Sequence, residues 1–340
     1  MEAVMVLLKS HKLLVTTALV GRSELKSLSK FAEVYRSDDM DGKSILNVLP
    51  EVDSVIFFSW PPFLTKENIS AMKRLRFIQS ILVGVDHIPF GSLGTDVVVS
   101  SNAGAYSLEV GEHVWALLLA AAKKIPEHHN RIREGETSMK AFAGAAKGIM
   151  VLHGRTLGIL GYGGIGKMAA TFGKAFGMRV IILTRQRTQD RSVTTYRGRS
   201  GLKRLLKESD AVVLAVPLTR RTKGIIGDEE LHIMKKTSAL VNVARGDLVD
   251  QEALYAHLVA NPDFRYACDV WWFKHDRETL KTDLPLARLP NFIGTPHISG
   301  PTGLASGRPA KLAAENTIRY LRGLRPNNVV DRSEYPSAQE

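Results

Sequence analysis

A glycine-rich segment, GILGYGGIG, carries the strongest chemical signal in the chain. Gly161, Gly163 and Gly166 follow an apolar run and precede a helical pattern, in the spacing G-x-G-x-x-G. The first glycine permits a tight turn, the second lets the backbone approach a pyrophosphate, and the third allows a helix to pack closely on a strand. The helix would begin at Gly164 and Ile165, where free N–H groups can bind phosphates. The pattern predicts a dinucleotide-binding loop; the alternative is a glycine-rich turn with a structural role.

The end of the next apolar run should carry the residue that reads the adenosine ribose. In NAD-binding proteins an Asp or Glu roughly 20 residues after the glycines accepts hydrogen bonds from the ribose hydroxyls. Here that position is Thr184, and Arg185 and Arg187 follow it. A carboxylate would repel a 2′-phosphate, whereas two guanidinium groups would bind it through charge-assisted hydrogen bonds. This predicts NADP(H) as the preferred cofactor, with NAD(H) also possible; the alternative is a solvated arginine loop.

Apolar runs that alternate with helical patterns must position these residues. Runs that are apolar throughout are typical of strands in a parallel sheet covered on both faces, and they lie at residues 157–160, 180–183, 211–216, 239–243, 266–270 and 292–295. A weaker series predicts a second, smaller α/β unit upstream, at residues 13–15, 54–58, 77–81 and 97–99. The long apolar stretch of residues 112–125 predicts a helix that joins the two.

The composition is that of a globular protein. Of 340 residues, 44% are apolar and 24% are charged, which excludes wholesale disorder and suggests two domains. The longest apolar run, residues 114–122, is far shorter than the roughly 20 residues that a membrane span needs, and no signal peptide is expected. The single cysteine, Cys268, excludes a disulfide within the chain and a cysteine-based metal site. We therefore expect a cytoplasmic protein without a metal.

One segment accounts for most of the net charge of +12. Residues 179–223 hold 12 Lys and Arg against 3 Asp and Glu. Such a surface can indicate nucleic acid, an anionic membrane or an acidic ligand. The segment has no nucleic-acid recognition motif, so neither nucleic acid nor a membrane is expected as a partner. We assign the charge to the cofactor instead: Arg185 and Arg187 would meet the 2′-phosphate, while the remaining bases would raise the local potential.

Further segments resemble the D-isomer-specific 2-hydroxyacid dehydrogenase family. In the family's order they are ILVGVDHIP, NAGAYSLEVGEHVWALLLAAAKKI, VNVARGDLVDQEAL, YACDVWW and NFIGTPHISG, and the resemblance covers residues 54–325. It implies an α/β fold in which a Rossmann-type cofactor domain with a doubly wound parallel sheet, residues 102–298, is inserted into a smaller domain. That flavodoxin-like α/β substrate domain would comprise residues 1–101 and 299–340. The active site would lie in the cleft between the domains.

The resemblance also implies a reaction and its residues. The reaction is hydride transfer between the nicotinamide cofactor and a small 2-oxo acid, which becomes a D-2-hydroxy acid. Arg245 would bind the substrate's carboxylate and carbonyl, and His297 would be the general acid and base. Other residues follow by the same resemblance: a backbone clamp for the substrate at Val83, Gly84 and Val85, substrate contacts at Trp60 and Tyr106, and cofactor contacts at Val216, Pro217, Thr222, Val243, Ala244, Asp269 and Gly300.

One position departs from the family's pattern. The family usually has a glutamate five residues after the aspartate of its A-x-D-V segment, where it hydrogen-bonds the catalytic histidine. Counting from Asp269 leads to Lys274, and a lysine cannot stabilise a protonated imidazole. We therefore expect His297 to work without a glutamate partner and the pH optimum of reduction to move toward acid. Asp276 or Glu278 would supply a carboxylate only if the loop is rearranged.

These features predict an NADP-dependent reductase of 2-oxo acids of the glyoxylate, hydroxypyruvate or pyruvate type, without naming the acid. A nucleotide-sensing regulatory protein with weak catalysis, on the same fold, is one alternative, which Lys274 keeps open. A formate dehydrogenase-like enzyme is another. The asparagine that binds substrate in those enzymes aligns with Tyr106, which instead matches D-lactate dehydrogenase-like members. The resemblance also implies a homodimer, with the helix at residues 107–124 as a candidate interface.

Overall fold

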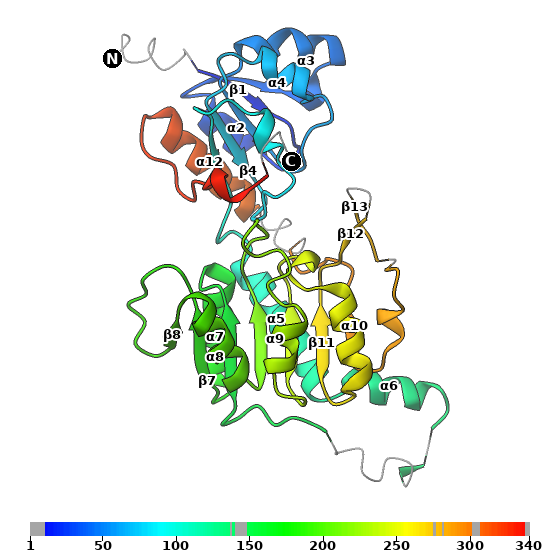
Figure 1. The fold of residues 1–340 in the computed structure, drawn as a ribbon. Coiled ribbons are helices and arrows are strands. Elements are labelled where there is room, and N and C mark those ends of the chain that lie inside the picture. The colour runs from blue at the N-terminus through cyan, green and yellow to red at the C-terminus, as the bar shows by residue number, and fades with distance from the viewer. Residues whose placement is uncertain are drawn as a thin grey trace. The chain divides into compact units, whose positions relative to one another are not determined.

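The computed structural model describes residues 11–136, 138–139, 148–274, 277–280, 282–300 and 307–336. The chain divides into two compact units (Figure 1): unit 1 comprises Met1–Tyr106 and Pro301–Glu340, and unit 2 comprises Ser107–Gly300. The family resemblance implies breaks a few residues earlier, before 102 and before 299. Within the described ranges, no helix is long and apolar enough to cross a membrane.

Unit 1 is built on a parallel sheet with the strand order β2-β1-β3-β4-β5, which is the flavodoxin-like order. The strands are β1 (Lys12–Val15), β2 (Glu33–Arg36), β3 (Ser54–Phe57), β4 (Phe77–Ser80) and β5 (Val98–Ser100). The helices of this unit are α2 (Arg22–Leu28), α3 (Gly42–Val48), α4 (Lys66–Ala71) and α12 (Arg308–Leu321). All residues of β3 and β4 are buried, so these two strands form the centre of the unit's core.

The C-terminal segment completes unit 1. Val329 forms an antiparallel bridge with Ser100 at the end of β5. Arg332 follows it and donates hydrogen bonds to four backbone carbonyl groups, those of Phe90, Leu93, Gly94 and Val97. Because one guanidinium group satisfies four carbonyl oxygens, this segment is fixed to the turn between β4 and β5.

Unit 2 is built on a seven-stranded sheet with the order β14-β11-β10-β9-β6-β7-β8, in which all pairs are parallel. This is the doubly wound Rossmann arrangement, and the order reverses between β6 and β9. The strands are β6 (Thr156–Leu160), β7 (Arg179–Leu183), β8 (Thr194–Tyr196), β9 (Ala211–Leu214), β10 (Ala239–Asn242), β11 (Arg265–Cys268) and β14 (Phe292–Gly294). A separate hairpin consists of β12 (Phe273–Lys274) and β13 (Arg277–Glu278).

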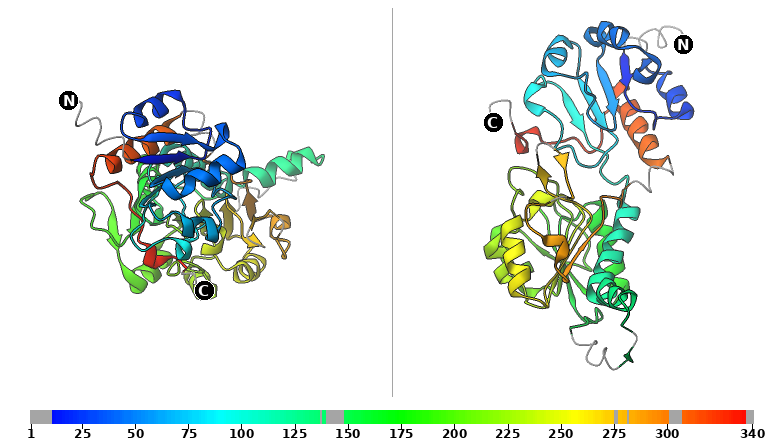
Figure 2. Two further views of the ribbon diagram at one scale, coloured as in Figure 1. Left: turned by 90° about the horizontal axis from the view of Figure 1, so that it is seen from above. Right: turned by 90° about the vertical axis from the view of Figure 1, so that its right-hand side faces the viewer.

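Helices cover both faces of this sheet (Figure 2). They are α5 (Ser107–Ala122), α6 (Ile125–Arg133), α7 (Gly164–Ala175), α8 (Gly198–Glu208), α9 (Asp228–Ile233) and α10 (Gln251–Ala260). Helix α5 begins five residues before the apolar stretch that predicts it, and it packs against α7. A side-chain carbon on Gly111 would lie 2.6 Å from Cβ of Met168, so a glycine is needed at this contact. Trp115 stacks on Phe176 and donates a hydrogen bond to the carbonyl of Ala169.

Candidate functional site in unit 2

The candidate site residues of unit 2 lie along one edge of its sheet. Because the strands are parallel, the segments that follow them meet at the carboxyl edge, and ligands of open α/β sheets bind there at the point where the strand order reverses. That point is the β6–β9 pair. The structure places the predicted residues after these strands: Gly161, Gly163, Gly164, Ile165 and Gly166 after β6; Thr184, Arg185 and Arg187 after β7; Val216, Pro217 and Thr222 after β9; Val243, Ala244 and Arg245 after β10; Asp269 after β11; His297 and Gly300 after β14.

The glycine loop has the geometry of a phosphate cradle. Gly161 has a φ of +95°, and a side-chain carbon there would lie 2.4 Å from the carbonyl oxygen of Ala215. A side-chain carbon on Gly166 would lie 2.1 Å from the carbonyl oxygen of Gly161. Gly163 is exposed, and a side-chain carbon there would meet nothing within 4 Å. The loop is therefore tight where helix and strand meet and open at the N-terminus of α7, which fits a pyrophosphate.

The arginine loop after β7 presents its charged side chains to solvent. Arg185 and Arg187 are exposed. Thr184 is half-buried; its N–H donates to the carbonyl of Tyr196, and its hydroxyl accepts a hydrogen bond from the N–H of Gln186. This turn directs the chain out of the sheet immediately before the arginines.

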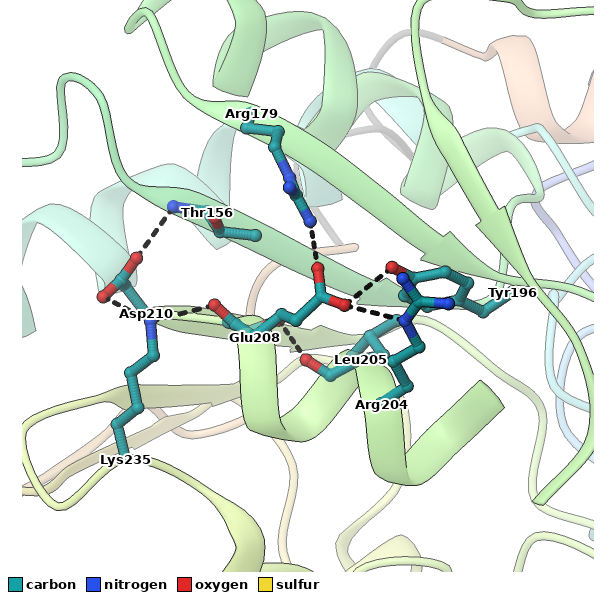
Figure 3. A network of polar contacts seen from close by, with 9 residues as sticks. Thr156, Arg179, Tyr196, Arg204, Leu205, Glu208, Asp210 and Lys235 are labelled. Carbon is teal, nitrogen blue, oxygen red and sulfur yellow. Dashed lines mark hydrogen bonds and ion pairs between the residues drawn. The ribbon is translucent and has the colours of Figure 1, made fainter. Parts of the chain in front are cut away.

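Several other basic side chains of the segment form ion pairs with carboxylates. Figure 3 shows Glu208, at the end of α8, between the guanidinium groups of Arg179 and Arg204 and the hydroxyl of Tyr196. The hydrogen bond from Arg204 has the largest effect and that from Tyr196 the next largest, and together they hold the pKa of Glu208 below its usual range. These arginines are therefore committed to an ion-pair network on the protein surface.

A second carboxylate forms ion pairs with two basic side chains of α8. Arg199 and Lys203 both pair with Glu229 of α9, with 3.1 Å between Arg199 Nη2 and Glu229 Oε2. Two bases share one carboxylate, so this cluster keeps a net positive charge, and the expectation that the remaining bases raise the local potential stays a prediction. Because Glu229 lies outside residues 179–223, a charge count over that segment alone could not include it.

Arg245 lies at the start of a 3-10 turn, Gly246–Leu248, directly after β10. Asn242 fixes this turn: its side-chain amide donates to the carbonyl of Arg245, and its Oδ1 accepts from the N–H of Ala244. A side-chain carbon on Gly246 would lie 2.3 Å from the carbonyl of Trp271, so the Arg245 turn and the Trp271 loop are in direct backbone contact. Trp271 and the neighbouring Trp272 are buried in the core.

His297 has a glutamate partner, and the expectation that it works without one is wrong. Nδ1 of His297 lies 2.5 Å from Oε2 of Glu278. Oε1 of Glu278 accepts a hydrogen bond of 2.7 Å from the backbone N–H of Trp271. The carboxylate therefore connects the backbone of the Trp271 loop to the imidazole and fixes which imidazole nitrogen faces it.

The β12–β13 hairpin explains why the position count leads to the wrong residue. Lys274 pairs with Arg277 in this hairpin, and Glu278 comes opposite Phe273. The chain doubles back there, so the carboxylate reaches the imidazole from position 278, four residues beyond Lys274. Glu278 is thus the partner of His297, and the predicted shift of the pH optimum toward acid loses its basis. Asp276 lies outside the described residues.

Asp269 organises the loop that carries His297. Its carboxylate is fully buried and accepts hydrogen bonds from the hydroxyl of Thr295 at 2.6 Å, the N–H of Ile298 at 3.0 Å and the N–H of Ser299 at 2.8 Å. Burial alone would raise the pKa of Asp269, but these hydrogen bonds bring it below its usual value. His297, inside the loop, has a φ of +55°, which is rare for a residue with a side chain. The predicted contact of Asp269 with the nicotinamide carboxamide stays a prediction.

His113 of helix α5 also belongs to this cluster. Its Nε2 lies 2.9 Å from the hydroxyl of Thr295 and 3.5 Å from Oδ1 of Asp269. The cluster therefore connects the long helix to the histidine loop. Nothing in the spacing of the sequence places residues 113 and 295 together.

The loop after β9 is also ordered by internal hydrogen bonds. The hydroxyl of Thr222 donates to the carbonyl of Pro217 at 2.6 Å and accepts from the N–H of Thr219 at 2.8 Å. Val216 packs partly buried against the core, and Cys268 is fully buried at the end of β11. Burial raises the pKa of the Cys268 thiol far above its usual value, so the thiol stays protonated and is no candidate nucleophile.

The predicted substrate residues of unit 1 follow two neighbouring strands. Trp60 follows β3, and residues 83–85 follow β4, so both segments lie at the carboxyl edge of that sheet. Val83 and Gly84 are half-buried, and Val85 belongs to the core. The indole N–H of Trp60 donates to the carbonyl of Leu64 at 3.1 Å.

Tyr106 lies at the end of unit 1 and is 5% exposed. Its hydroxyl donates a hydrogen bond of 3.1 Å to the carbonyl of Ile81, just after β4. This contact supports the backbone segment that leads to residues 83–85. It gives Tyr106 a scaffold role beside the predicted substrate contact, which stays a prediction.

The fold and the site together define a nicotinamide-dependent oxidoreductase class. The family model of the D-isomer specific 2-hydroxyacid dehydrogenases, NAD binding domain, matches residues 115–299, more than half of the chain. The chain belongs to this family. It lacks the pattern glutamate at 274 and has instead the Glu278–His297 pair.

Individual relatives place the chain more closely. A glyoxylate reductase of Aeropyrum pernix is 36% identical over 268 residues, which are 78% of each chain. A D-3-phosphoglycerate dehydrogenase of Methanocaldococcus jannaschii is 32% identical over 330 residues; these are 96% of this chain but only 60% of that relative's length. A solved structure of a candidate formate dehydrogenase from Pyrobaculum aerophilum is similar with a TM-score of 0.78 and 28% identity, covering 95% of this chain and 99% of that one. The chain is a 2-hydroxyacid oxidoreductase.

Proposed function

We propose that the protein is an NADP(H)-dependent reductase that interconverts small 2-oxo acids and D-2-hydroxy acids, of the glyoxylate, hydroxypyruvate or pyruvate type. The observation that carries the proposal is the hydrogen bond between Glu278 Oε2 and His297 Nδ1, on the same sheet edge as Arg245. A histidine backed by a carboxylate is a proton donor and acceptor, and an arginine is a carboxylate ligand. These two functions are what reduction of a 2-oxo acid requires from the protein.

In the proposed mechanism, the protein's residues handle the carboxylate and the proton. The Arg245 guanidinium binds the substrate's carboxylate and polarises its carbonyl oxygen, and the N–H groups of residues 83–85 bind the remaining carboxylate oxygen. The hydride for the carbonyl carbon would come from the nicotinamide when it is bound. His297 then donates its Nε2 proton to the carbonyl oxygen, which becomes the 2-hydroxyl. Glu278 keeps the other imidazole proton on Nδ1 and stabilises the positive charge of the imidazole before the transfer.

The proposed preference for NADP(H) is supported by the arginine loop. Thr184 leaves no carboxylate to repel a 2′-phosphate, and the exposed Arg185 and Arg187 follow immediately. Arg199 and Lys203 pair with Glu229, so the proposal assigns the 2′-phosphate contact to the loop arginines and not to these two bases. NAD(H) remains usable, since the loop carries nothing that would exclude an unphosphorylated ribose.

The protein is proposed to act as a homodimer in the cytoplasm. The apolar face of α5 packs inside unit 2. Helix α6 has no buried residue, and its Ile125 and Ile132 are 54% and 59% exposed. The proposed interface therefore extends from α5 onto α6. Sedimentation at micromolar concentration should report a dimer, and a monomer there would refute this part. The single cysteine, which leaves no disulfide within the chain, suits a reducing compartment.

Turnover tests the proposed function. NADPH consumption should be measured with glyoxylate, hydroxypyruvate and pyruvate, with NADH in parallel, and NADP⁺ reduction should be measured with formate. We expect turnover of at least one 2-oxo acid, faster with NADPH than with NADH at equal concentration. Tight NADPH binding without turnover of any acid would overturn the proposal in favour of a nucleotide-sensing regulatory protein. Formate is not expected to be oxidised, because Tyr106 occupies the position of the asparagine in formate dehydrogenases.

A further inference from the structure

The arginine loop is fixed at its start by Arg197, which follows β8. The guanidinium group of Arg197 donates to the carbonyl oxygens of Arg185 at 3.4 Å and Gln186 at 3.1 Å. Together with the turn at Thr184, this holds the backbone around the first arginine. Arg197, one of the basic residues of the segment 179–223, thus binds the backbone of the arginine loop.

The other end of the loop is held by a tyrosine of the glycine loop. The hydroxyl of Tyr162 donates a hydrogen bond of 2.6 Å to Oδ2 of Asp190. The second oxygen, Oδ1, accepts from the N–H of Ser192 at 2.9 Å and from its hydroxyl. Lys174, in the last turn of α7, donates to the Ser192 hydroxyl at 2.8 Å and lies 3.7 Å from the carboxylate of Asp190. Asp190 therefore accepts three hydrogen bonds and has a nearby cation.

The position of Tyr162 in the sequence gives this contact its significance. Tyr162 stands between Gly161 and Gly163, in the turn that would hold the pyrophosphate. Asp190 ends the loop that would hold the adenosine phosphate. One hydrogen bond thus joins two segments that would bind adjacent parts of the same dinucleotide.

The charges of the contact suit a persistent hydrogen bond. The hydrogen bond from the Ser192 hydroxyl lowers the pKa of Asp190 most, and the hydrogen bond from Tyr162 lowers it further. Burial and the bond to Asp190 raise the pKa of the Tyr162 phenol. At neutral pH the phenol is a donor and the carboxylate an acceptor, so the bond is charge-assisted. The nearby Lys174 offsets the carboxylate charge, which would otherwise oppose an anionic ligand.

We propose that the Tyr162–Asp190 contact is a clasp that presets the arginine loop for the 2′-phosphate, so that Tyr162 is a positioning residue for selectivity between NADPH and NADH. The inference rests on the proposed NADP(H) preference. A loop held in its binding conformation loses less conformational entropy when the ligand binds. The arginines would contact only the phosphate that distinguishes the two nucleotides, so loosening the loop costs affinity for NADPH and much less for NADH.

The test is Tyr162→Phe, with dissociation constants for NADPH and NADH measured by fluorescence titration. The variant removes one charge-assisted hydrogen bond and keeps the ring. We expect the dissociation constant for NADPH to rise about tenfold and that for NADH to rise less than about threefold. Tyr35→Phe is the matched control, because Tyr35 donates the same kind of bond, at 2.7 Å, to Glu33 in unit 1; it should leave both constants unchanged.

Hydrogen exchange separates the clasp from the cofactor preference. In the nucleotide-free protein, amides of residues 185–192 should exchange faster in Tyr162→Phe than in the wild type or in Tyr35→Phe. Unchanged exchange, or equal loss of affinity for both nucleotides, overturns the clasp. If the wild type binds NADH as tightly as NADPH, the proposed cofactor preference is wrong, and so is the selectivity role of Tyr162. Faster amide exchange in Tyr162→Phe would in that case still support the clasp as a contact that fixes the loop.

Discussion

The Glu278–His297 pair predicts a specific loss of rate when the carboxylate is neutralised. In Glu278→Gln the side chain keeps its shape but has one oxygen for two donors, the imidazole Nδ1–H and the N–H of Trp271. One bond is lost, or the amide nitrogen faces the imidazole and opposes its protonation. Hydrogen bonds to charged groups contribute about 1.5–3 kcal/mol and neutral ones about 0.5–1.5 kcal/mol, so the change costs about 1–2 kcal/mol.

Solvent screening reduces this magnitude. The side chains of His297 and Glu278 are 43% and 23% exposed, so we take the lower half of the range. A barrier raised by about 1.4 kcal/mol lowers kcat about tenfold. Removing the acid itself, as in His297→Ala, should cost about 100-fold or more. Both variants therefore lower kcat, but His297→Ala lowers it about ten times more or further.

The assay is steady-state reduction of the best 2-oxo acid across pH, with KM for NADPH measured separately. We expect kcat of Glu278→Gln to fall about tenfold at neutral pH and the KM for NADPH to stay constant. Glu252→Gln, an exposed glutamate of α10, is the matched control and should behave as the wild type. A kcat within twofold of the wild type, or a change confined to KM for NADPH, would refute the assigned role of Glu278.

Two further carboxylates give predictions of a different kind. Asp269→Asn places an amide group against one of three donors in the histidine loop, so we expect kcat to fall about tenfold and the free energy of unfolding to fall by about 1–3 kcal/mol; a rise in KM for NADPH alone would instead assign the residue to the cofactor. Asp210 is buried and accepts hydrogen bonds from the Thr156 N–H at 2.9 Å and from Lys235 at 2.9 Å (Figure 3). Burial raises the pKa of Asp210, but these bonds outweigh burial and lower it. The Asp210 carboxylate thus stabilises the fold at pH values above its unfolded pKa, and this stabilisation is lost as pH falls through the lower folded pKa. We expect Asp210→Asn to be less stable than the wild type by about 1–3 kcal/mol in urea unfolding at pH 7, and this difference should disappear at acid pH. A difference that persists at acid pH would contradict this assignment.

Strands inside the seven-stranded sheet of unit 2 were predictable because they are apolar on both faces. Residues 157–160, 180–183 and 239–243 correspond to β6, β7 and β10 within a residue or two. The edge strands β2 and β8 were not predicted, since EVYR and TTY have exposed or half-buried side chains and no apolar run. The glycine loop was predictable for a related reason: close backbone contacts leave a sequence signature that open surface does not.

The partner of the histidine could not be found by counting positions, because its place depends on a hairpin of two-residue strands. Such strands are too short to show a period in the sequence, and their register, with Glu278 opposite Phe273, decides which side chain faces the imidazole. The chemistry constrains the site more tightly than the spacing does. A carboxylate at Nδ1 supports a histidine that donates a proton, and any backbone path that places one there can serve. Here the backbone N–H of Trp271, which follows β11, donates a hydrogen bond to the Glu278 carboxylate. The hairpin therefore only has to return the chain to the end of β11.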